Sequence, residues 1–436
     1  MKTGFTSEQL ADPATAASEK AIRTCVHCGF CTATCPTYVL LGDERDSPRG
    51  RIVLIKEMLE KNQAPTPEVV THIDRCLSCL ACTTTCPSGV DYMHLIDHAR
   101  VHVEETHKRS FADRTLRWAL AKILPYPSRF SAALHLGRLA SPLAGLTAKL
   151  PGGRRIAALL RTARGARPST AKLEGASATG ARRGRVILQG GCVEPVMRPE
   201  FQAATARLLT RCGYDVVRAS NEGCCGSLVH HMGREKEALA FVRHSVDVWS
   251  AAIEAGDVDA IIITVSGCGT TIKDYGFLLR NDPDYAARAA RISALAKDIS
   301  EFLTPGLLPA SKANPKMRVA YHAACSLQHG QKITSQPKQL LEQAGFEVAT
   351  PVNAHLCCGS AGVYSVLQPE IADELGDRKT ASLDALNAGV IATGNVGCAV
   401  QISARTGTPV VHIAELLDWA TGGPAPKALA ESRKQR

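Results

Sequence analysis

The first part of the chain carries its apolar residues at helical spacing. In the segment RIVLIKEMLEK, residues 51–61, apolar side chains recur every three or four positions, as on one face of a helix. Residues 18–23, 68–75 and 90–107 also have a helical character, and few stretches resemble strands. The pattern therefore predicts an α-helical domain over residues 1–107.

From residue 184 onward, short apolar runs typical of strands alternate with helical segments. The first unit, residues 184–305, has strands in RVILQGG, YDVVRAS and DAIIITV, with helices over 201–212 and 234–255. The second unit, residues 316–422, has the same order, with strands in RVAYHAA, FEVATPV and VIATGNVG and helices in PKQLLEQAG and QPEIADELGDRK. Strands that alternate with helices predict a parallel α/β layer in each unit.

Residues 108–183 connect the helical domain to these units and mix apolar with basic residues. Between Lys108 and Arg185 there are 17 Lys and Arg against two acids, so this segment carries +15 and the rest of the chain about −5. A basic amphipathic connector is compatible with an anionic membrane surface, an acidic partner subunit or a solvated linker. Its second half is rich in Gly, Ala, Ser and Arg and is expected to be flexible, and residues 423–436 are expected to form a disordered tail.

Composition limits the classes of function. A chain of 436 residues suggests roughly three domains. It has no apolar run of the ~18 residues that span a bilayer and no signal peptide, so we expect a cytoplasmic protein. An aromatic content of 5% and the lack of a nucleic-acid-binding module argue against a nucleic-acid partner. Seventeen cysteines in a chain that is not exported indicate metal binding or redox chemistry.

Eight of these cysteines form two copies of the motif C-x2-C-x2-C-x3-C-P. This spacing is typical of [4Fe–4S] clusters, in which the fourth cysteine of each motif ligates the other cluster. Zinc usually takes paired C-x2-C units, and disulfides require an oxidising compartment. We therefore expect two [4Fe–4S] clusters, one held by Cys25, Cys28, Cys31 and Cys86 and the other by Cys76, Cys79, Cys82 and Cys35.

Each α/β unit contains a Cys-Cys-Gly triplet, and in both units 31 residues separate the first cysteine from the triplet. The cysteines fall at the carboxyl ends of predicted strands or in the following turns, where open α/β sheets bind ligands. Cys212 lies on a helix, has no counterpart in the second unit, and is expected to be structural. Further metal or thiol sites are therefore expected at Cys192, Cys224, Cys225 and Cys268 and at Cys325, Cys357, Cys358 and Cys398.

A double ferredoxin motif followed by two Cys-Cys-Gly (CCG) repeats resembles the cysteine-rich electron-transfer family. That family includes heterodisulfide reductase subunits, the small subunit of anaerobic glycerol-3-phosphate dehydrogenase and lactate-utilisation proteins. Within it, the segments HCGFCTATCPTY, SPRGRI and HLCCGSAGVYSV are similar to those of bacterial glycolate oxidase (glycolate dehydrogenase) iron–sulfur subunits. The similarity covers nearly the whole chain and is weakest in the basic connector.

The resemblance implies an electron-transfer subunit rather than the site of hydride chemistry. The sequence has no G-x-G-x-x-G motif after a strand, so FAD is expected on partner subunits that oxidise glycolate to glyoxylate. Electrons would then pass one at a time to a quinone or another respiratory acceptor, with the chain peripheral on the cytoplasmic face of the inner membrane. The alternatives are lactate or glycerol 3-phosphate as substrate, a disulfide-cleaving chain like heterodisulfide reductase, and a non-enzymatic scaffold or redox sensor.

The chain departs from the family at the end of each repeat, where many members have C-x2-C. Val265 and Asn395 stand in place of the first cysteine of that pair. Members with a noncubane iron–sulfur cluster use five cysteines per site, so four cysteines leave open a zinc ion, an ordinary cube or a metal-free thiol site. His322 and His355 lie near the second set in the sequence and are candidates for ligands or proton donors.

Overall fold

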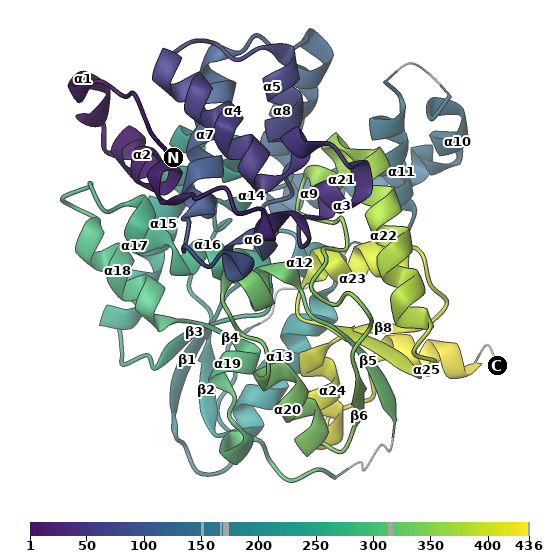
Figure 1. The fold of residues 1–436 in the computed structure, drawn as a ribbon. Helices are drawn as coiled ribbons and strands as arrows, with labels where there is room; N and C mark the ends of the chain where they lie inside the picture. Colours follow the sequence, from purple (N-terminus) through teal and green to yellow (C-terminus); the bar gives the residue numbers. More distant parts are fainter. Residues whose placement is uncertain (150–151, 166–167, 169–173, 313–316, 435–436) are drawn as a thin grey trace.

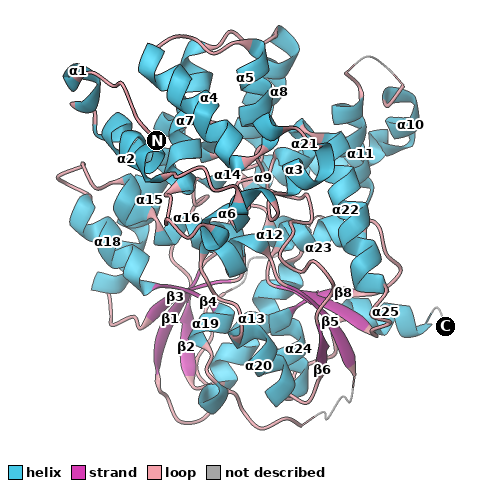
Figure 2. Ribbon diagram, in the orientation of Figure 1, coloured by secondary structure: helices cyan, strands magenta, loops and turns pink. Residues whose placement is uncertain are grey.

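The computed structural model describes residues 1–149, 152–165, 168, 174–312 and 317–434. Helices from the N-terminal part form one end of the molecule, and two small sheets lie side by side at the other end (Figures 1 and 2). The helical end covers the carboxyl ends of the strands, where the cysteines of the repeats lie. The predicted class, a helical ferredoxin-type domain followed by two α/β repeats, agrees with this mostly helical architecture and its two small parallel sheets.

The N-terminal domain is entirely helical in the described residues. Helix α4 starts where the Ser47 hydroxyl accepts a hydrogen bond from the Gly50 amide and Pro48 occupies the first helical position, and it ends at Asn62 in the left-handed conformation. Its apolar face packs with α2, α5 and α7 through Ile22, Ile55 and other fully buried residues. The elements are α1 (Ser7–Leu10), α2 (Pro13–Thr24), η1 (Phe30–Thr32), α3 (Pro36–Leu41), η2 (Glu44–Asp46), α4 (Pro48–Lys61), α5 (Pro67–Asp74), α6 (Ala81–Thr85) and α7 (Tyr92–Thr106).

The two repeats each contain a four-stranded parallel sheet, as the alternation of strands and helices predicted. The strand orders are β2-β1-β3-β4 and β6-β5-β7-β8, so the two sheets have the same topology. The last strand of each sheet was not predicted, because it has only three residues and leads directly into a helix, so its apolar residues do not form a separate run. The strands are β1 (Gly184–Leu188), β2 (Tyr214–Val217), β3 (Ala260–Ile263), β4 (Ala296–Asp298), β5 (Arg318–His322), β6 (Glu347–Ala349), β7 (Val390–Thr393) and β8 (Val410–His412).

Helices surround both sheets, and the connections between strands contain them. The first repeat has α12 (Glu194–Met197), α13 (Pro199–Arg211), α14 (Ser227–His230), α15 (Glu235–Glu254), α16 (Ser266–Lys273), α17 (Tyr275–Leu278), α18 (Ala286–Leu295), α19 (Ile299–Phe302) and η4 (Pro305–Leu307). The second has η5 (Ser326–Gly330), α20 (Gln336–Gln343), α21 (Tyr364–Leu367), α22 (Pro369–Asp384), α23 (Val396–Ser403), α24 (Ile413–Ala420) and α25 (Lys427–Lys434).

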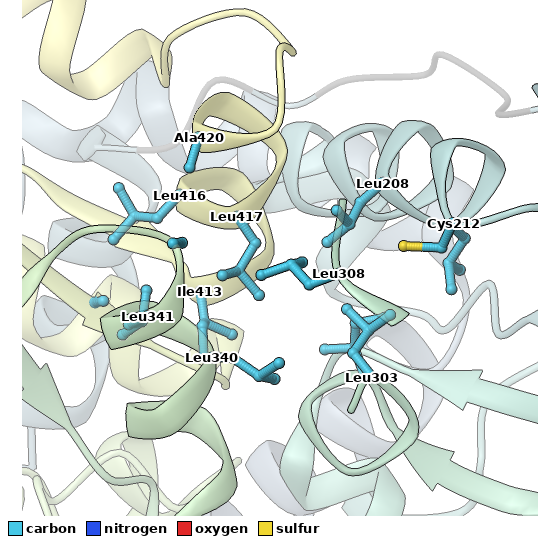
Figure 3. Packing of buried hydrophobic residues seen from close by; sticks show 14 of the residues in the cluster. Leu208, Cys212, Leu303, Leu308, Leu340, Leu341, Ile413, Leu416, Leu417 and Ala420 are labelled. Carbon is cyan, nitrogen blue, oxygen red and sulfur yellow. The ribbon is translucent and has the colours of Figure 1, made fainter. Parts of the chain in front are cut away.

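The two repeats fold around one shared hydrophobic core (Figure 3). Leu208 of α13 in the first repeat faces Leu417 of α24 in the second, and Leu340 of α20 lies in the same cluster. Burial of each such side chain is worth about 1.5–3 kcal/mol. The guanidinium groups of Arg207 and Arg211 also pair with the buried carboxylate of Asp418. The relative position of the two cysteine sites is therefore fixed by apolar and ionic contacts between the repeats.

The connector forms helices α8 (Phe111–Ile123), α9 (Pro127–Ala140), η3 (Ser141–Leu143), α10 (Ala144–Thr147) and α11 (Arg154–Gly165). Arg117 of α8 is buried and binds Asp74 of the N-terminal domain at 2.9 Å. Leu120 of α8 packs in one cluster with Val229 of the first repeat and Val366 of the second. The first half of the connector therefore joins all three parts of the protein.

Two expectations of flexibility need correction. Residues 154–165 form α11, because the side chains of Leu159 and Ala163 pack against neighbouring clusters, although residues 166–167 and 169–173 of the same expected flexible segment lie outside the described residues. Residues 427–434 form α25, because Leu429 is buried in the shared core. Composition alone did not reveal these few apolar anchors. In the described part of the chain, no helix has the length and hydropathy to cross a bilayer.

His94 of α7 joins the N-terminal domain to the first repeat. Its ring stacks on Phe277 with 3.5 Å between centroids, and its Nε2 lies 3.0 Å from a carboxylate oxygen of Asp274. Burial lowers the pKa of His94, but hydrogen bonds to Asp274 and Asp91 outweigh this effect and raise the pKa to about 9. The contact is therefore a charged hydrogen-bonded pair at neutral pH.

We expect this contact to make stability depend on pH. The pKa of His94 is raised in the folded state, so its contribution is complete below pH 6.5 and is lost as the pH rises through about 9. The thermal unfolding midpoint of the native protein should fall as the pH rises from 6.5 to 9.5. Expressed as free energy of unfolding, this loss should be about 1–3 kcal/mol larger in the native protein than in His94→Gln. Equal decreases in the two proteins would contradict this role of His94.

Candidate metal centres

The four cysteines expected to hold the first cluster all line one cavity. Cys25 follows α2, Cys31 lies in η1 and Cys86 follows α6. Cys28 lies in the loop between Cys25 and Cys31. The loop turns through left-handed conformations at His27 and Gly29, which carries the chain around the cavity. The φ of Gly29 is 85°, which glycine adopts without strain, and a Cβ atom there would lie 2.5 Å from the movable end of the Arg49 side chain.

The other four cysteines, Cys35, Cys76, Cys79 and Cys82, line a second cavity. Its loop has the same left-handed turns at the matching positions, Ser78 and Leu80. The fourth cysteine of each motif lies with the first three cysteines of the other motif. The two cavities are neighbours, since both are lined by Cys82, Pro48 and Tyr92. The structure thus brings together the residues of each expected ligand set.

A buried arginine balances the charge beside the second cavity. Arg51 is 1% exposed and donates hydrogen bonds to Sγ of Cys35 at 3.9 Å, to Asp46 at 3.2 Å and to the carbonyl of His72 at 2.7 Å. Burial lowers the pKa of Arg51, but the neighbouring acidic groups, Cys76 first among them, raise it far above its ordinary value. Arg51 is therefore a fixed positive charge that stabilises thiolates in this cavity.

The two cavities differ in their access to solvent. Cys28 is exposed, and Val26 and Phe30 beside it are 67% and 63% exposed, so the first cavity opens at an apolar part of the surface. In the second cavity, burial raises the pKa of both Cys79 and Cys82 well above the ordinary value. The second cavity is thus enclosed, and the thiols of Cys79 and Cys82 keep their protons unless a metal displaces them.

The second cavity adjoins the cysteines of the second repeat. Cys79 and Cys357 belong to one buried cluster, against which Cys325 also packs. The Tyr364 hydroxyl, from α21, donates a hydrogen bond to the Arg75 carbonyl at 2.9 Å, and the Thr84 hydroxyl contacts His329 at 2.7 Å. The N-terminal domain is therefore packed on the CCG site of the second repeat.

In the first repeat the four expected cysteines come together at the carboxyl edge of the sheet. The Cys192 thiol donates to Sγ of Cys224 at 3.5 Å, and the Cys225 and Cys268 thiols are in hydrogen-bond contact. The Gly226 amide donates to Sγ of Cys224 at 3.4 Å, and the φ of Gly226 is 87°. The glycine of the triplet thus allows a tight turn that presents both thiols.

The second repeat has the same arrangement with one additional donor. The Cys325 thiol donates to Sγ of Cys357 at 3.7 Å, and the Asn395 amide donates to Sγ of Cys398 at 3.3 Å. Contacts with Cys357 and Cys398 hold the pKa of Cys358 well below its ordinary value, whereas the pKa of each of these two neighbours is raised. Cys358 therefore ionises before Cys357 and Cys398.

Both repeats open into one common cavity between them. Its lining includes seven of the eight CCG cysteines, all except Cys224. The connector supplies apolar wall residues such as Leu120 and Phe130, and α21 supplies Leu367. The common cavity is accordingly apolar toward the connector and lined with thiols toward the sheets.

The remaining candidate residues, Cys212, His355 and His322, have different surroundings. Cys212 is buried in the shared core, where burial raises its pKa to about 11, as expected for a structural cysteine. His355 is only partly buried, and none of its contacts is with a cysteine sulfur in the described structure. His322, at the end of β5, is 1% exposed and lies beside Cys358 and Cys398.

Sequence reasoning missed two buried acidic residues near these sites. Asp46 binds Arg51, Arg75 and His72 behind the second cavity, and the segment SPRGRI that contains Arg51 was the available signal. Glu194 lines the common cavity and accepts a hydrogen bond from Thr264 at 2.8 Å. Burial raises the pKa of Glu194 to about 8, and no local motif marks this residue in the sequence.

A helical domain with two cysteine-lined cavities, followed by paired thiol-bearing α/β repeats, defines an iron–sulfur oxidoreductase protein of the cysteine-rich class. Residues 21–90 match the 4Fe-4S dicluster domain family, and residues 186–273 and 319–403 match the cysteine-rich domain family. The chain belongs to the family of glycolate oxidase iron–sulfur subunits. It is 39% identical over 422 residues to the Escherichia coli glycolate oxidase iron–sulfur subunit, with 96% of this chain and 99% of the relative covered.

Other proteins are similar to this chain over different lengths. A probable glycolate oxidase iron–sulfur subunit of Bacillus subtilis is 32% identical over 426 residues, which cover 93% of this chain and 95% of the relative. Lactate utilization protein A of Geobacillus kaustophilus is 29% identical over 241 residues, 54% of this chain and 98% of the relative. A hypothetical protein from Helicobacter pylori shares the fold with a TM-score of 0.55 at 9% identity, over 98% of this chain and 75% of that chain.

Proposed function

We propose that this chain carries electrons, one at a time, from flavin-bearing partner subunits that oxidise glycolate toward a quinone or another respiratory acceptor. The observation that carries the proposal is the arrangement of the eight ferredoxin cysteines. They line two adjoining cavities, one open at the surface and one enclosed against the second repeat. Such an arrangement supplies an entrance and an internal exit for electrons.

The residues fit two [4Fe–4S] clusters. In this proposal Cys25, Cys28, Cys31 and Cys86 hold the first cluster, and Cys76, Cys79, Cys82 and Cys35 hold the second. When bound, such clusters exchange single electrons, which matches a relay between a two-electron flavin and an acceptor. Arg51 offsets the negative charge of the second set and donates to Sγ of Cys35. Hydrogen bonds to ligand sulfurs and nearby charge both tune reduction potential.

The exposures of the two cavities give the relay a direction. The surface cavity at Cys28 is the entrance, because a partner subunit can approach it closely. The enclosed cavity at Cys79 is the exit, because Cys325 and Cys357 of the second repeat pack against it and line the common cavity. The acceptor in this proposal is reduced in or near the common cavity.

Serine substitution of one ligand in each set tests the relay. In the assembled complex, we expect Cys28→Ser and Cys79→Ser to abolish glycolate-dependent quinone reduction, while glycolate still reduces the partner flavin. Iron should fall from about eight per chain toward about four in each variant. Cys212→Ala, which alters a buried cysteine outside both cavities, should retain iron and turnover. Full turnover in a double variant that lacks both ligands would exclude the relay.

The entrance also predicts the docking surface for the flavin partner. Val26 and Phe30 are large, exposed apolar residues that flank the exposed Cys28. We expect Val26→Asp with Phe30→Asp to lower recovery of the partner with the chain at least tenfold, because the introduced charges would be desolvated in the interface. Val352→Asp is the control, since Val352 is 77% exposed on the second repeat. Unchanged recovery with intact iron content would place the interface elsewhere.

We further propose that the connector binds an anionic membrane surface on the cytoplasmic face of the inner membrane. Leu136, Leu139, Leu143, Leu146 and Ile156 are between 51% and 80% exposed and come from neighbouring helices α9 to α11. Basic residues of the same segment, Arg138, Lys149, Arg154 and Arg161, accompany them. Exposed leucines together with basic side chains are typical of peripheral membrane contact.

Vesicle binding tests this surface. We expect the chain to sediment with vesicles that contain 30% phosphatidylglycerol and to bind neutral phosphatidylcholine vesicles much more weakly. Added salt should weaken binding to the phosphatidylglycerol vesicles. Leu139→Glu with Leu146→Glu should reduce binding at least tenfold, because two apolar contacts are lost and two negative charges are added. Val352→Glu should bind like the native chain. Equal binding by all three proteins would contradict the assignment.

A further inference from the structure

The second repeat contains a buried histidine whose ring lies beside two thiols. His322 is 1% exposed, and neither of its ring nitrogens makes a hydrogen bond of good geometry among the described residues, although the ring interacts with the Cys358 thiol. A buried imidazole without a well-formed hydrogen bond is costly, so its position calls for a physical explanation. One ring nitrogen and the sulfurs of Cys358 and Cys398 all lie within 4.8 Å of one another, and all three side chains are buried.

We propose that the second repeat binds one zinc-class ion through His322, Cys358 and Cys398, with a fourth thiolate from the adjacent Cys325–Cys357 pair. Two sulfur ligands of a single zinc ion lie at most about 4.6 Å apart, because each Zn–S bond is about 2.3 Å long. One ring nitrogen of His322 and the sulfurs of Cys358 and Cys398 lie within 4.8 Å of one another, close to this limit, and the Cys357 thiol is in hydrogen-bond contact with Cys358. Imidazole and thiolate are the ligands that structural zinc prefers.

A buried cation accompanies the proposed site. Lys379 of α22 is 4% exposed and donates hydrogen bonds to the carbonyls of Asn353 at 3.0 Å and Ala354 at 3.4 Å. Burial lowers the pKa of Lys379, and the charges of the four cysteines of this repeat oppose that shift and favour its charged form. A divalent ion with three thiolates and one neutral imidazole carries a net charge of −1. Lys379 would neutralise that charge inside the protein.

The first repeat lacks both of these features. Gln189 occupies the position three residues before the first cysteine, where the second repeat has His322. Ala238 of α15 and Ala372 of α22 are equivalent, because the carbonyl of each faces the glycine of its own Cys-Cys-Gly triplet. Counted from these two residues, the position of Lys379 in α22 matches Ser245 in α15. A side-chain amide is a poor ligand for soft or borderline ions. We therefore infer that the ion binds to one repeat only.

Zinc does not change its oxidation state, so this site would not carry current. It would instead fix the carboxyl edge of the second sheet against the enclosed cavity at Cys79. The inference is independent of the electron relay, because zinc content and iron content are separate measurements.

Metal analysis of the full chain in its complex tests the proposal. After growth with added zinc, we expect about one zinc per chain, with sulfur and nitrogen ligands in the zinc X-ray absorption spectrum. His322→Gln, which installs the residue of the first repeat, and Cys398→Ser should each lower zinc at least fivefold and leave iron unchanged. Cys268→Ser, the equivalent change in the first repeat, should retain zinc. Unchanged iron also shows that the variants remain folded.

Cobalt provides a second measurement. Chain loaded with Co²⁺ should show tetrahedral ligand-field bands and sulfur-to-cobalt charge transfer, and both should be lost or shifted in His322→Gln but not in Cys268→Ser. Zinc that is absent from the native chain, or unaffected by His322→Gln, would overturn the proposal. Iron above eight per chain that disappears in His322→Gln would also overturn it, because a cluster would then occupy the site.

Discussion

The packing of the enclosed ferredoxin cavity on the second repeat is the contact on which the arrangement of sites depends. Cys79, Cys357 and Tyr364 share one buried cluster, and the Tyr364 hydroxyl ties α21 to the Arg75 carbonyl. Because the repeats share a core, the same contact also sets the position of the first repeat. The connector helix α8 then closes the common cavity, since Arg117 binds Asp74 on one side and Leu120 packs on both repeats.

Charge is the second constraint on this assembly. Buried thiolates repel one another and lose hydration, so a site rich in cysteine needs metal ions or nearby cations to be stable. Arg51 serves the enclosed cavity and Lys379 serves the second repeat, and both are almost fully buried. The first cavity needs less internal compensation because Cys28 reaches solvent. A buried cation thus accompanies two of the buried cysteine sites, whereas the first repeat has Ser245 at the position of Lys379.

Residues whose spacing is local could be predicted from the sequence, and residues joined only by the fold could not. The two C-x2-C-x2-C-x3-C-P motifs predicted which cysteines would meet, including the exchange of Cys35 and Cys86, because the motif itself specifies that geometry. The helical domain and the parallel sheets followed from apolar periodicity. The strands β4 and β8 were missed because each leads directly into the following helix, and α25 was missed because a single buried leucine holds it. The contact between Cys79 and Cys357 joins residues 278 positions apart and had no signal in the sequence.

The two repeats share their backbone plan but differ in the chemistry that they present to the common cavity. Where the second repeat has His322 and Leu327, the first has Gln189 and Glu194 at the same distances from the first cysteine. Glu194 has a pKa raised by burial to about 8, so it holds a proton at neutral pH, whereas Leu327 is a buried apolar residue. The first repeat therefore faces the common cavity with a group that exchanges protons, and the second with donors suited to an ion. Reduction of an organic acceptor by the proposed relay would require protons as well as electrons, and Glu194 and Cys76, an expected ligand of the second cluster, both line this cavity.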